Sequence, residues 1–247
     1  IILFHGNHNS RLMYGLIPDF PCQTGLHLIV PDRPGYGLSD FYPQDYSVVD
    51  YPNDVIALAD SLGVDKFAVF GFSGGGPSAL ACAWKIPQRL LAAGVFGSIG
   101  PLTTVSAEGI IPGLRILYWL APRLPWTIRI PMAVVSFLVD HYLDLYLKLV
   151  YSKLAAVDQA VYVRLGLGEA LRRDRIEGFR QGGRASAYDI ELAGRWPIPL
   201  EQIKFEVHLW QGEKDRNVGG MGLYLSERLP NCNATFIRNA GHYWLFE

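Results

Sequence analysis

Short apolar runs alternate with helix-like segments along most of this chain, and this alternation constrains the fold more than any other feature. The apolar runs lie at 1–4, 27–30, 66–70, 91–96, 206–210 and 234–237. Most lack the polar alternation of a half-exposed strand, which is typical of parallel strands that helices cover on both faces. Helix-like segments lie at 51–62, 77–85 and 222–229. The pattern predicts an α/β protein with a doubly wound, mostly parallel sheet.

The alternation stops at Pro101 and resumes only with the strand-like run that begins at Glu206. The sequence between them is helical in character, rich in aromatic and aliphatic residues, and too long for a loop. Prolines should break it at positions 112, 122, 125 and 131. We therefore predict a core domain made of 1–100 and 196–247, interrupted by a helical cap at 101–195.

Composition argues against several classes of protein. Half of the 247 residues are hydrophobic, 18% are charged and the net charge is -1. Such a chain can bury a large core, and it lacks the basic surface that a nucleic-acid-binding protein needs. The longest apolar stretches, such as 131–139, fall well short of the roughly 20 residues of a membrane helix. We expect no nucleic-acid partner and no membrane span.

The cysteines suggest a cellular location, and the first residues suggest that the sequence does not include the native N-terminus. Cys22, Cys82 and Cys232 are an odd number and lie far apart, which suggests neither a disulfide framework nor a metal site. A reducing, cytoplasmic location is therefore expected. The sequence opens with Ile1 inside an apolar run, so we expect the native N-terminus to lie outside it.

The segment GFSGG at 71–75 is the strongest chemical motif. It has the form G-x-S-x-G and stands between a strand-like run and a helix-like segment rich in small residues. A tight turn there would hold the middle residue in a strained backbone conformation and expose the hydroxyl of Ser73 at the start of the helix. The motif predicts a nucleophilic serine, and the alternative is a glycine-rich turn without chemistry.

A serine nucleophile needs a base, most often a histidine that a carboxylate orients. His242 follows a strand-like run in a loop, whereas the other histidines lie in strands, in the insertion or near the start of the chain. Asp215 follows the 206–210 run and is the predicted carboxylate, with Glu213 as its local competitor and a solvated acidic turn as the alternative. The order Ser73, Asp215, His242 is that of an α/β-hydrolase triad.

Two backbone N–H groups should stabilise the oxyanion that forms when the serine attacks a carbonyl group. Gly74, directly after the nucleophile, is one predicted donor. Asn7, in the turn after the first apolar run, is the other, unless this segment is a plain turn. His5 and His8 in the same segment could suggest a metal, but no third ligand stands at a suitable spacing, so we expect neither a metal nor a cofactor.

Together, these motifs make the sequence resemble the α/β-hydrolase fold family over nearly all of the chain outside the insertion. The matching segments are FHG at 4–6, PDRPGYGLSD at 31–40, GFSGGG at 71–76, QGEKD at 211–215 and GH at 241–242. The resemblance implies that Ser73, Asp215 and His242 form the triad, that the insertion is a cap over the pocket, and that Asp32 and Arg33 brace the loop beside the oxyanion turn. The family usually has Pro-Gly where His8 and Asn9 stand here. Similar proteins also have strands before Ile1 and a helix after the histidine, so the chain resembles one trimmed at both ends.

These features predict a serine hydrolase that cleaves carboxylic esters through an acyl-enzyme. The apolar insertion either packs on its own helices or roofs a pocket for a hydrophobic, small to medium acyl group. The same triad could cleave a thioester, a lactone or a carbon-carbon bond, or catalyse peroxidation without a cofactor. An aspartate nucleophile, as in epoxide hydrolases, is disfavoured because Ser73 occupies the turn. The rival from another class is a non-catalytic ligand-binding protein on the same fold.

Overall fold

The computed structural model describes residues 1–16, 25–43, 46–164 and 168–246. A five-stranded sheet runs through it, and each strand is parallel to its neighbours. The strands follow one another across the sheet in chain order: β1 (Ile2–Phe4), β2 (Phe67–Phe72), β3 (Leu90–Phe96), β4 (Val207–Gly212) and β5 (Cys232–Ile237). The prediction of an α/β fold with a parallel sheet is confirmed.

The apolar run at 27–30 was expected to be a strand, and this prediction is wrong. It contributes one isolated bridge, in which Ile29 pairs with Ile2. The N–H of Leu3 donates to the carbonyl of Ile29, and the N–H of Ile29 donates to the carbonyl of Ile1. Pro31 follows almost at once and has no N–H, so it cannot continue the ladder.

Helices flank the sheet and bury its apolar side chains. The flanking helices are α2 (Tyr51–Ser61), α3 (Gly76–Lys85) and α10 (Met221–Arg228). The small side chains of α3 let it lie close against β1, β2 and β3, while α10 packs on β4 and β5. The largest core cluster joins strand residues such as Phe4 and Val95 to Leu80 of α3 and Leu225 of α10.

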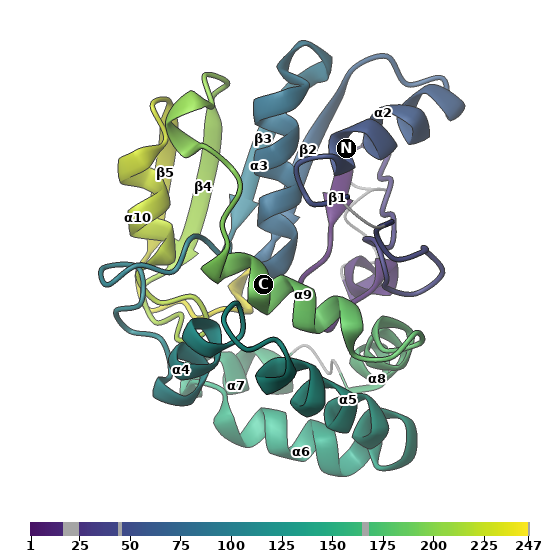
Figure 1. Cartoon of the computed structure of the whole chain (residues 1–247), viewed down its shortest axis with the longest axis vertical. Coiled ribbons are helices and arrows are strands. Elements are labelled where there is room, and N and C mark those ends of the chain that lie inside the picture. Colours follow the sequence, from purple (N-terminus) through teal and green to yellow (C-terminus); the bar gives the residue numbers. More distant parts are fainter. Residues whose placement is uncertain (17–24, 44–45, 165–167, 247) are drawn as a thin grey trace.

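A group of helices lies between β3 and β4 in the chain and beyond one end of the sheet in space (Figure 1). Its members within the described residues are α4 (Pro112–Leu120), α5 (Trp126–His141), α6 (Leu143–Lys153), α7 (Ala156–Arg164), α8 (Gly168–Gly178) and α9 (Arg184–Gly194). Short 3₁₀ helices occur elsewhere, at Arg11–Leu16, Ser73–Gly75, Pro87–Arg89, Leu200–Gln202 and Trp244–Phe246. The proposed division into a core and a cap of 101–195 stays a prediction.

The prolines of this helical segment do not all act as expected. Pro112 begins α4, and Pro122 and Pro125 lie between α4 and α5. Pro131, however, stands inside α5, which continues past it to His141. A proline there removes one helical hydrogen bond. The inner face of α5 is buried through Ile128 and Met132, and this packing holds the helix together across the proline.

Candidate active site

Ser73 stands where β2 ends and the turn into α3 begins. Its φ of 52° lies in the left-handed region, which is strained for a residue with a side chain. The strand and the turn approach closely here, because a Cβ placed on Gly71 would lie 2.4 Å from the carbonyl oxygen of Gly75. The two outer glycines of GFSGG therefore allow the sharp turn that presents the serine hydroxyl, as the motif predicts.

The structure brings the three residues of the predicted triad together. The Ser73 Oγ lies 3.0 Å from Nε2 of His242, and Nδ1 of His242 lies 2.7 Å from Oδ2 of Asp215. Both His242 and Asp215 are buried. The other oxygen of Asp215 accepts the backbone N–H groups of Asn217 and Val218, which fixes the carboxylate. Glu213, the competing carboxylate, is exposed and two residues away.

The electrostatics around His242 favour a proton-accepting imidazole. Burial lowers the pKa of His242, but the charge and hydrogen bond of Asp215 raise it, with a smaller contribution from Asp158. The net result is a pKa above the ordinary value. A hydrogen-bonded carboxylate on Nδ1 also leaves Nε2 unprotonated and directed at the serine when the imidazole is neutral. This is the arrangement that a general base needs.

The two predicted oxyanion donors lie next to each other. A Cβ added to Gly74 would lie 2.9 Å from the backbone nitrogen of Asn7. The side chain of Asn7 is fixed on both sides: its amide donates to the carbonyl of Ser186, and its oxygen accepts the hydroxyl of Tyr36. The structure thus places the turn after β1 beside the turn after β2. The role of these N–H groups stays a prediction.

Of the other histidines, His5 has a structural role. The Nδ1 of buried His5 bonds to the Gly6 carbonyl and its Nε2 accepts the N–H of Arg33, so both ring nitrogens are occupied. Burial lowers the pKa of His5 well below its usual value, which keeps the ring neutral. The cavity beside Ser73 is lined by His8 but not by His27, His141 or His208. In the described part of the chain, no three His, Cys, Asp or Glu residues are grouped to hold a metal ion.

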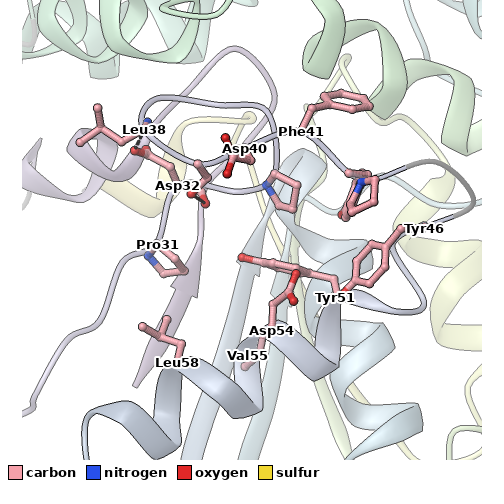
Figure 2. A pocket seen from close by; sticks show the side chains of 14 residues that line it. Pro31, Asp32, Leu38, Asp40, Phe41, Tyr46, Tyr51, Asp54, Val55 and Leu58 are labelled. Carbon is pink, nitrogen blue, oxygen red and sulfur yellow. Dashed lines mark hydrogen bonds between the residues drawn. The ribbon is translucent and has the colours of Figure 1, made fainter.

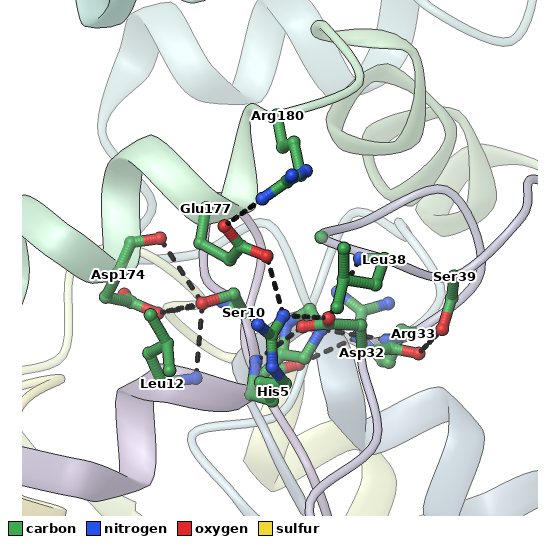
Figure 3. A network of polar contacts seen from close by, with 12 residues as sticks. His5, Ser10, Leu12, Asp32, Arg33, Leu38, Ser39, Asp174, Glu177 and Arg180 are labelled. Carbon is green, nitrogen blue, oxygen red and sulfur yellow. Dashed lines mark hydrogen bonds and ion pairs between the residues drawn. The ribbon is translucent and has the colours of Figure 1, made fainter.

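The loop 31–40 and the turn after β1 are tied to the inserted helices by a polar network (Figure 3). Arg33 donates to the His5 carbonyl at 2.8 Å and makes two hydrogen bonds to Asp189 of α9, at 2.9 and 2.6 Å. Arg11 pairs with Asp32 and with Glu177 of α8. Arg33 thus links the turn after β1 directly to Asp189 of the inserted helices, whereas Asp32 is linked to them only through Arg11. Sequence reasoning missed these partners in the insertion, and the oxyanion role of the turn stays a prediction.

Asp158 at the start of α7 is a further residue that the sequence gave no reason to select. It is buried, and its Oδ1 accepts the backbone N–H of Tyr243 at 2.8 Å. Burial raises the pKa of Asp158, and hydrogen bonds from the backbone of Tyr243 and His242 offset part of that rise. A Cβ at Gly241 would come within 2.3 Å of this carboxylate, so only glycine fits there. Asp158 therefore holds the loop that carries His242.

We predict that Asp158→Asn shifts the acid limb of the pH profile of kcat/KM to lower pH. The negative charge of Asp158 raises the pKa of His242, so its removal should lower that pKa and keep the base neutral in more acidic solution. Asparagine retains an oxygen that can accept the N–H of Tyr243, so the loop should keep its place. Asp140→Asn, an exposed change on α5, is the matched control. An unchanged acid limb would contradict the role of Asp158.

A cavity of about 330 Å³ opens beside Ser73 and His242. Its walls come largely from the inserted helices and are mostly apolar, and include Leu114, Tyr118, Val135, Tyr146, Val150 and Ile190. Arg175 of α8 and Lys153 of α6 add positive charge, and no Asp or Glu of the described chain lines this cavity. Arg175 is buried and donates to the carbonyl of His8 at 2.7 Å, which ties α8 to the turn after β1.

A second cavity, of about 500 Å³, lies between the 31–43 loop and α2 (Figure 2). Asp32, Asp40 and Asp54 contribute carboxylates to it, beside the rings of Tyr46 and Tyr51. None of the predicted catalytic residues lines it, and it contains no serine-histidine pair. The chemistry therefore points to the smaller cavity beside Ser73.

Known proteins share this architecture. The family described as alpha/beta hydrolase fold matches residues 1–106, and a solved esterase of Thermogutta terrifontis superimposes with a TM-score of 0.65 over 100% of this chain and 83% of that one, at 19% identity. Residues 1–106 thus match the α/β-hydrolase family, and the whole chain has the α/β-hydrolase fold. Within this family, the strand-turn-helix around Ser73 is the expected place of the nucleophile.

Two curated relatives share sequence with this α/β-hydrolase-fold chain to different extents. An uncharacterized hydrolase of Saccharomyces cerevisiae is 36% identical over 93 residues, which are 36% of this chain and 31% of that protein. The chain thus spans about a third of the relative it matches there. A 2-hydroxy-6-oxononadienedioate/2-hydroxy-6-oxononatrienedioate hydrolase of Burkholderia vietnamiensis is 28% identical over 91% of this chain and 73% of its own length. The longer match extends through the inserted helices.

Proposed function

We propose that this protein is a serine hydrolase that cleaves carboxylic esters with an apolar acyl group. The observation that carries the proposal is the hydrogen-bonded series from Ser73 through His242 to Asp215, which opens on the mostly apolar cavity. A serine hydroxyl next to a neutral imidazole, with a buried carboxylate behind it, is the arrangement that activates a nucleophile for acyl transfer. The match of residues 1–106 to the α/β-hydrolase family supports the same reaction class.

In the proposed reaction, the Ser73 Oγ attacks the ester carbonyl while Nε2 of His242 takes the hydroxyl proton. The backbone N–H groups of Asn7 and Gly74 stabilise the oxyanion of the tetrahedral intermediate. His242 then passes the proton to the leaving alcohol, and an acyl-enzyme remains. His242 next takes a proton from water, whose oxygen attacks the acyl-enzyme, and returns it to Ser73 as the carboxylic acid leaves. Asp215 keeps the imidazole in the productive tautomer throughout.

The walls of the cavity support an apolar acyl group. Side chains from α4, α5, α6 and α9 face it, such as Leu114, Val135, Val150 and Ile190. A volume of about 330 Å³ falls at the lower end of the range for small-molecule sites. A small to medium acyl chain therefore fits better than a long one. The scattered cysteines continue to favour a cytoplasmic location for this reaction.

We expect kcat/KM to rise from acetyl to medium-chain p-nitrophenyl esters and then to level off. Each buried methylene contributes about 0.8 kcal/mol, so two added carbons should raise kcat/KM roughly tenfold until the cavity is full. A panel of p-nitrophenyl esters of increasing acyl length measures this directly. Val135→Ala removes part of the cavity wall and so enlarges the cavity. The acyl length at which kcat/KM levels off should therefore increase in this variant. A steady fall from acetyl onward would contradict an apolar acyl pocket.

Two other functions rest on the same site and are separated by simple measurements. The triad could cleave a lactone, a thioester or a carbon-carbon bond, and the relative from Burkholderia vietnamiensis acts on a 2-hydroxy-6-oxo dienedioate. Activity on such a substrate that far exceeds activity on every ester would favour this alternative. A non-catalytic binding protein would instead fail to react with a fluorophosphonate probe, which labels an activated serine.

A further inference from the structure

The outward face of α5 is an unbroken apolar stripe. Trp126, Ile130, Val134 and Phe137 follow one another at spacings of four, four and three residues, so they lie along one side of the helix. Each of these side chains is more than half exposed. The opposite side of the same helix is buried through Ile128, Met132 and Val139. Helix α5 therefore has apolar side chains both on its buried face and on its solvent-exposed face.

The neighbouring helix α4 also exposes large apolar side chains. Ile116 and Trp119 are three residues apart on α4, and each is more than half exposed. Leu124 lies between the two helices and is also exposed. Figure 1 shows α4 and α5 within the helical group beyond the end of the sheet, and the two helices contact each other. The outer cap face, as we name it, comprises Ile116, Trp119, Trp126, Ile130, Val134 and Phe137. Water-soluble proteins rarely expose so many large apolar side chains together unless they bind something there.

The charged side chains that lie between Glu108 and Asp140 in the sequence are all positive. From Gly109 to Val139 the chain has three arginines, Arg115, Arg123 and Arg129, and no aspartate or glutamate. Arg129 pairs with Glu191 of α9, whereas Arg115 and Arg123 make no ion pair within the described residues. The guanidinium of Arg123 lies 4.5 Å from the ring centre of Trp119. Exposed tryptophans beside unpaired arginines are typical of helices that lie in the headgroup region of a bilayer.

We propose that the outer cap face docks on the surface of a bilayer that contains anionic lipids. The apolar side chains would enter the interface, and Arg115 and Arg123 would meet the lipid phosphates. No described helix is long and apolar enough to cross a membrane, so the contact is with one leaflet. A second copy of the chain fits less well, because a twofold contact through this face would bring the arginines of both copies together.

Docking in this position would link the bilayer to the catalytic cavity. Leu114 and Tyr118 of α4 and Val135 of α5 line the cavity beside Ser73, while other residues of the same helices form the outer cap face. A movement of α4 or α5 on a lipid surface would therefore change the cavity wall.

Sedimentation with lipid vesicles tests the proposal without relying on enzymatic activity. The wild-type protein should sediment with vesicles of equal parts phosphatidylcholine and phosphatidylglycerol, and much less with phosphatidylcholine alone. Trp126→Ser combined with Phe137→Ser should reduce the partition coefficient at least about tenfold, because two large apolar side chains no longer enter the interface. Arg115→Gln and Arg123→Gln should each weaken binding to the anionic vesicles about fivefold and reduce its salt dependence.

Leu91→Ser is the matched control, since Leu91 is an equally exposed apolar residue on β3, outside the inserted helices. It should bind vesicles like the wild type. Equal loss in this control, or no sedimentation of the wild type with anionic vesicles, would overturn the proposal. A dimer in analytical ultracentrifugation that Trp126→Ser dissociates, without any vesicle binding, would overturn it in favour of a second copy of the chain.

Discussion

Ser73→Ala should lower kcat for ester hydrolysis by about 10⁴-fold or more, and it should abolish labelling by a fluorophosphonate probe. The reason is that no other hydroxyl oxygen lies within hydrogen-bond distance of His242 Nε2 among the described residues. The members of a triad act as a unit, so removal of the nucleophile loses nearly the whole chemical contribution. Initial rates on the best p-nitrophenyl ester and gel-based detection of the probe measure the two effects.

Ser78→Ala provides the matched control for this variant. Ser78 lies on α3, is buried, and does not line the cavity beside Ser73. Alanine favours a helix, so the control should fold normally and keep both activity and labelling. If Ser73→Ala keeps either property while its circular dichroism matches the wild type, Ser73 is not the nucleophile. The ester-hydrolase proposal would then fail as well.

Asp215→Asn is expected to lower kcat by up to roughly 10⁴-fold with little change in stability. The amide can keep the size of the carboxylate and still accept the N–H groups of Asn217 and Val218 through its oxygen. It can no longer stabilise a protonated imidazole, and it favours the wrong tautomer of His242. Because Asp215 also raises the pKa of His242, the acid limb that remains should lie at lower pH.

Glu213→Gln distinguishes the two carboxylates of the QGEKD segment. Glu213 is exposed and its side chain makes no hydrogen bond or ion pair within the described residues, so its substitution should leave kcat nearly unchanged. Steady-state kinetics of both variants, with thermal unfolding as a check on folding, gives the comparison. Loss of activity in Glu213→Gln with a normal rate in Asp215→Asn would show that the other carboxylate orients the histidine.

The features that the sequence predicted well are those that depend on neighbours in the chain. The parallel sheet follows from short apolar runs separated by helices, and the turn at Ser73 follows from glycines that permit close backbone approach. The errors were also local. The run at 27–30 has strand composition but forms only one bridge, and Pro131 does not end α5 because tertiary packing outweighs the lost hydrogen bond.

By itself, then, the sequence determined the fold class, the position of the serine turn and the candidate residues Ser73, Asp215 and His242. Parallel strands place their carboxyl ends at one edge of the sheet, so residues that follow different strands meet there. Only the tertiary structure decided which inserted side chains complete this site. Three such side chains lie on three different helices: Asp158, Arg175 and Asp189. Each makes a hydrogen bond to a residue near the site that is more than 80 positions away in the chain. The packing of those helices depends on long-range contacts, which leave no signal in local periodicity or motif spacing.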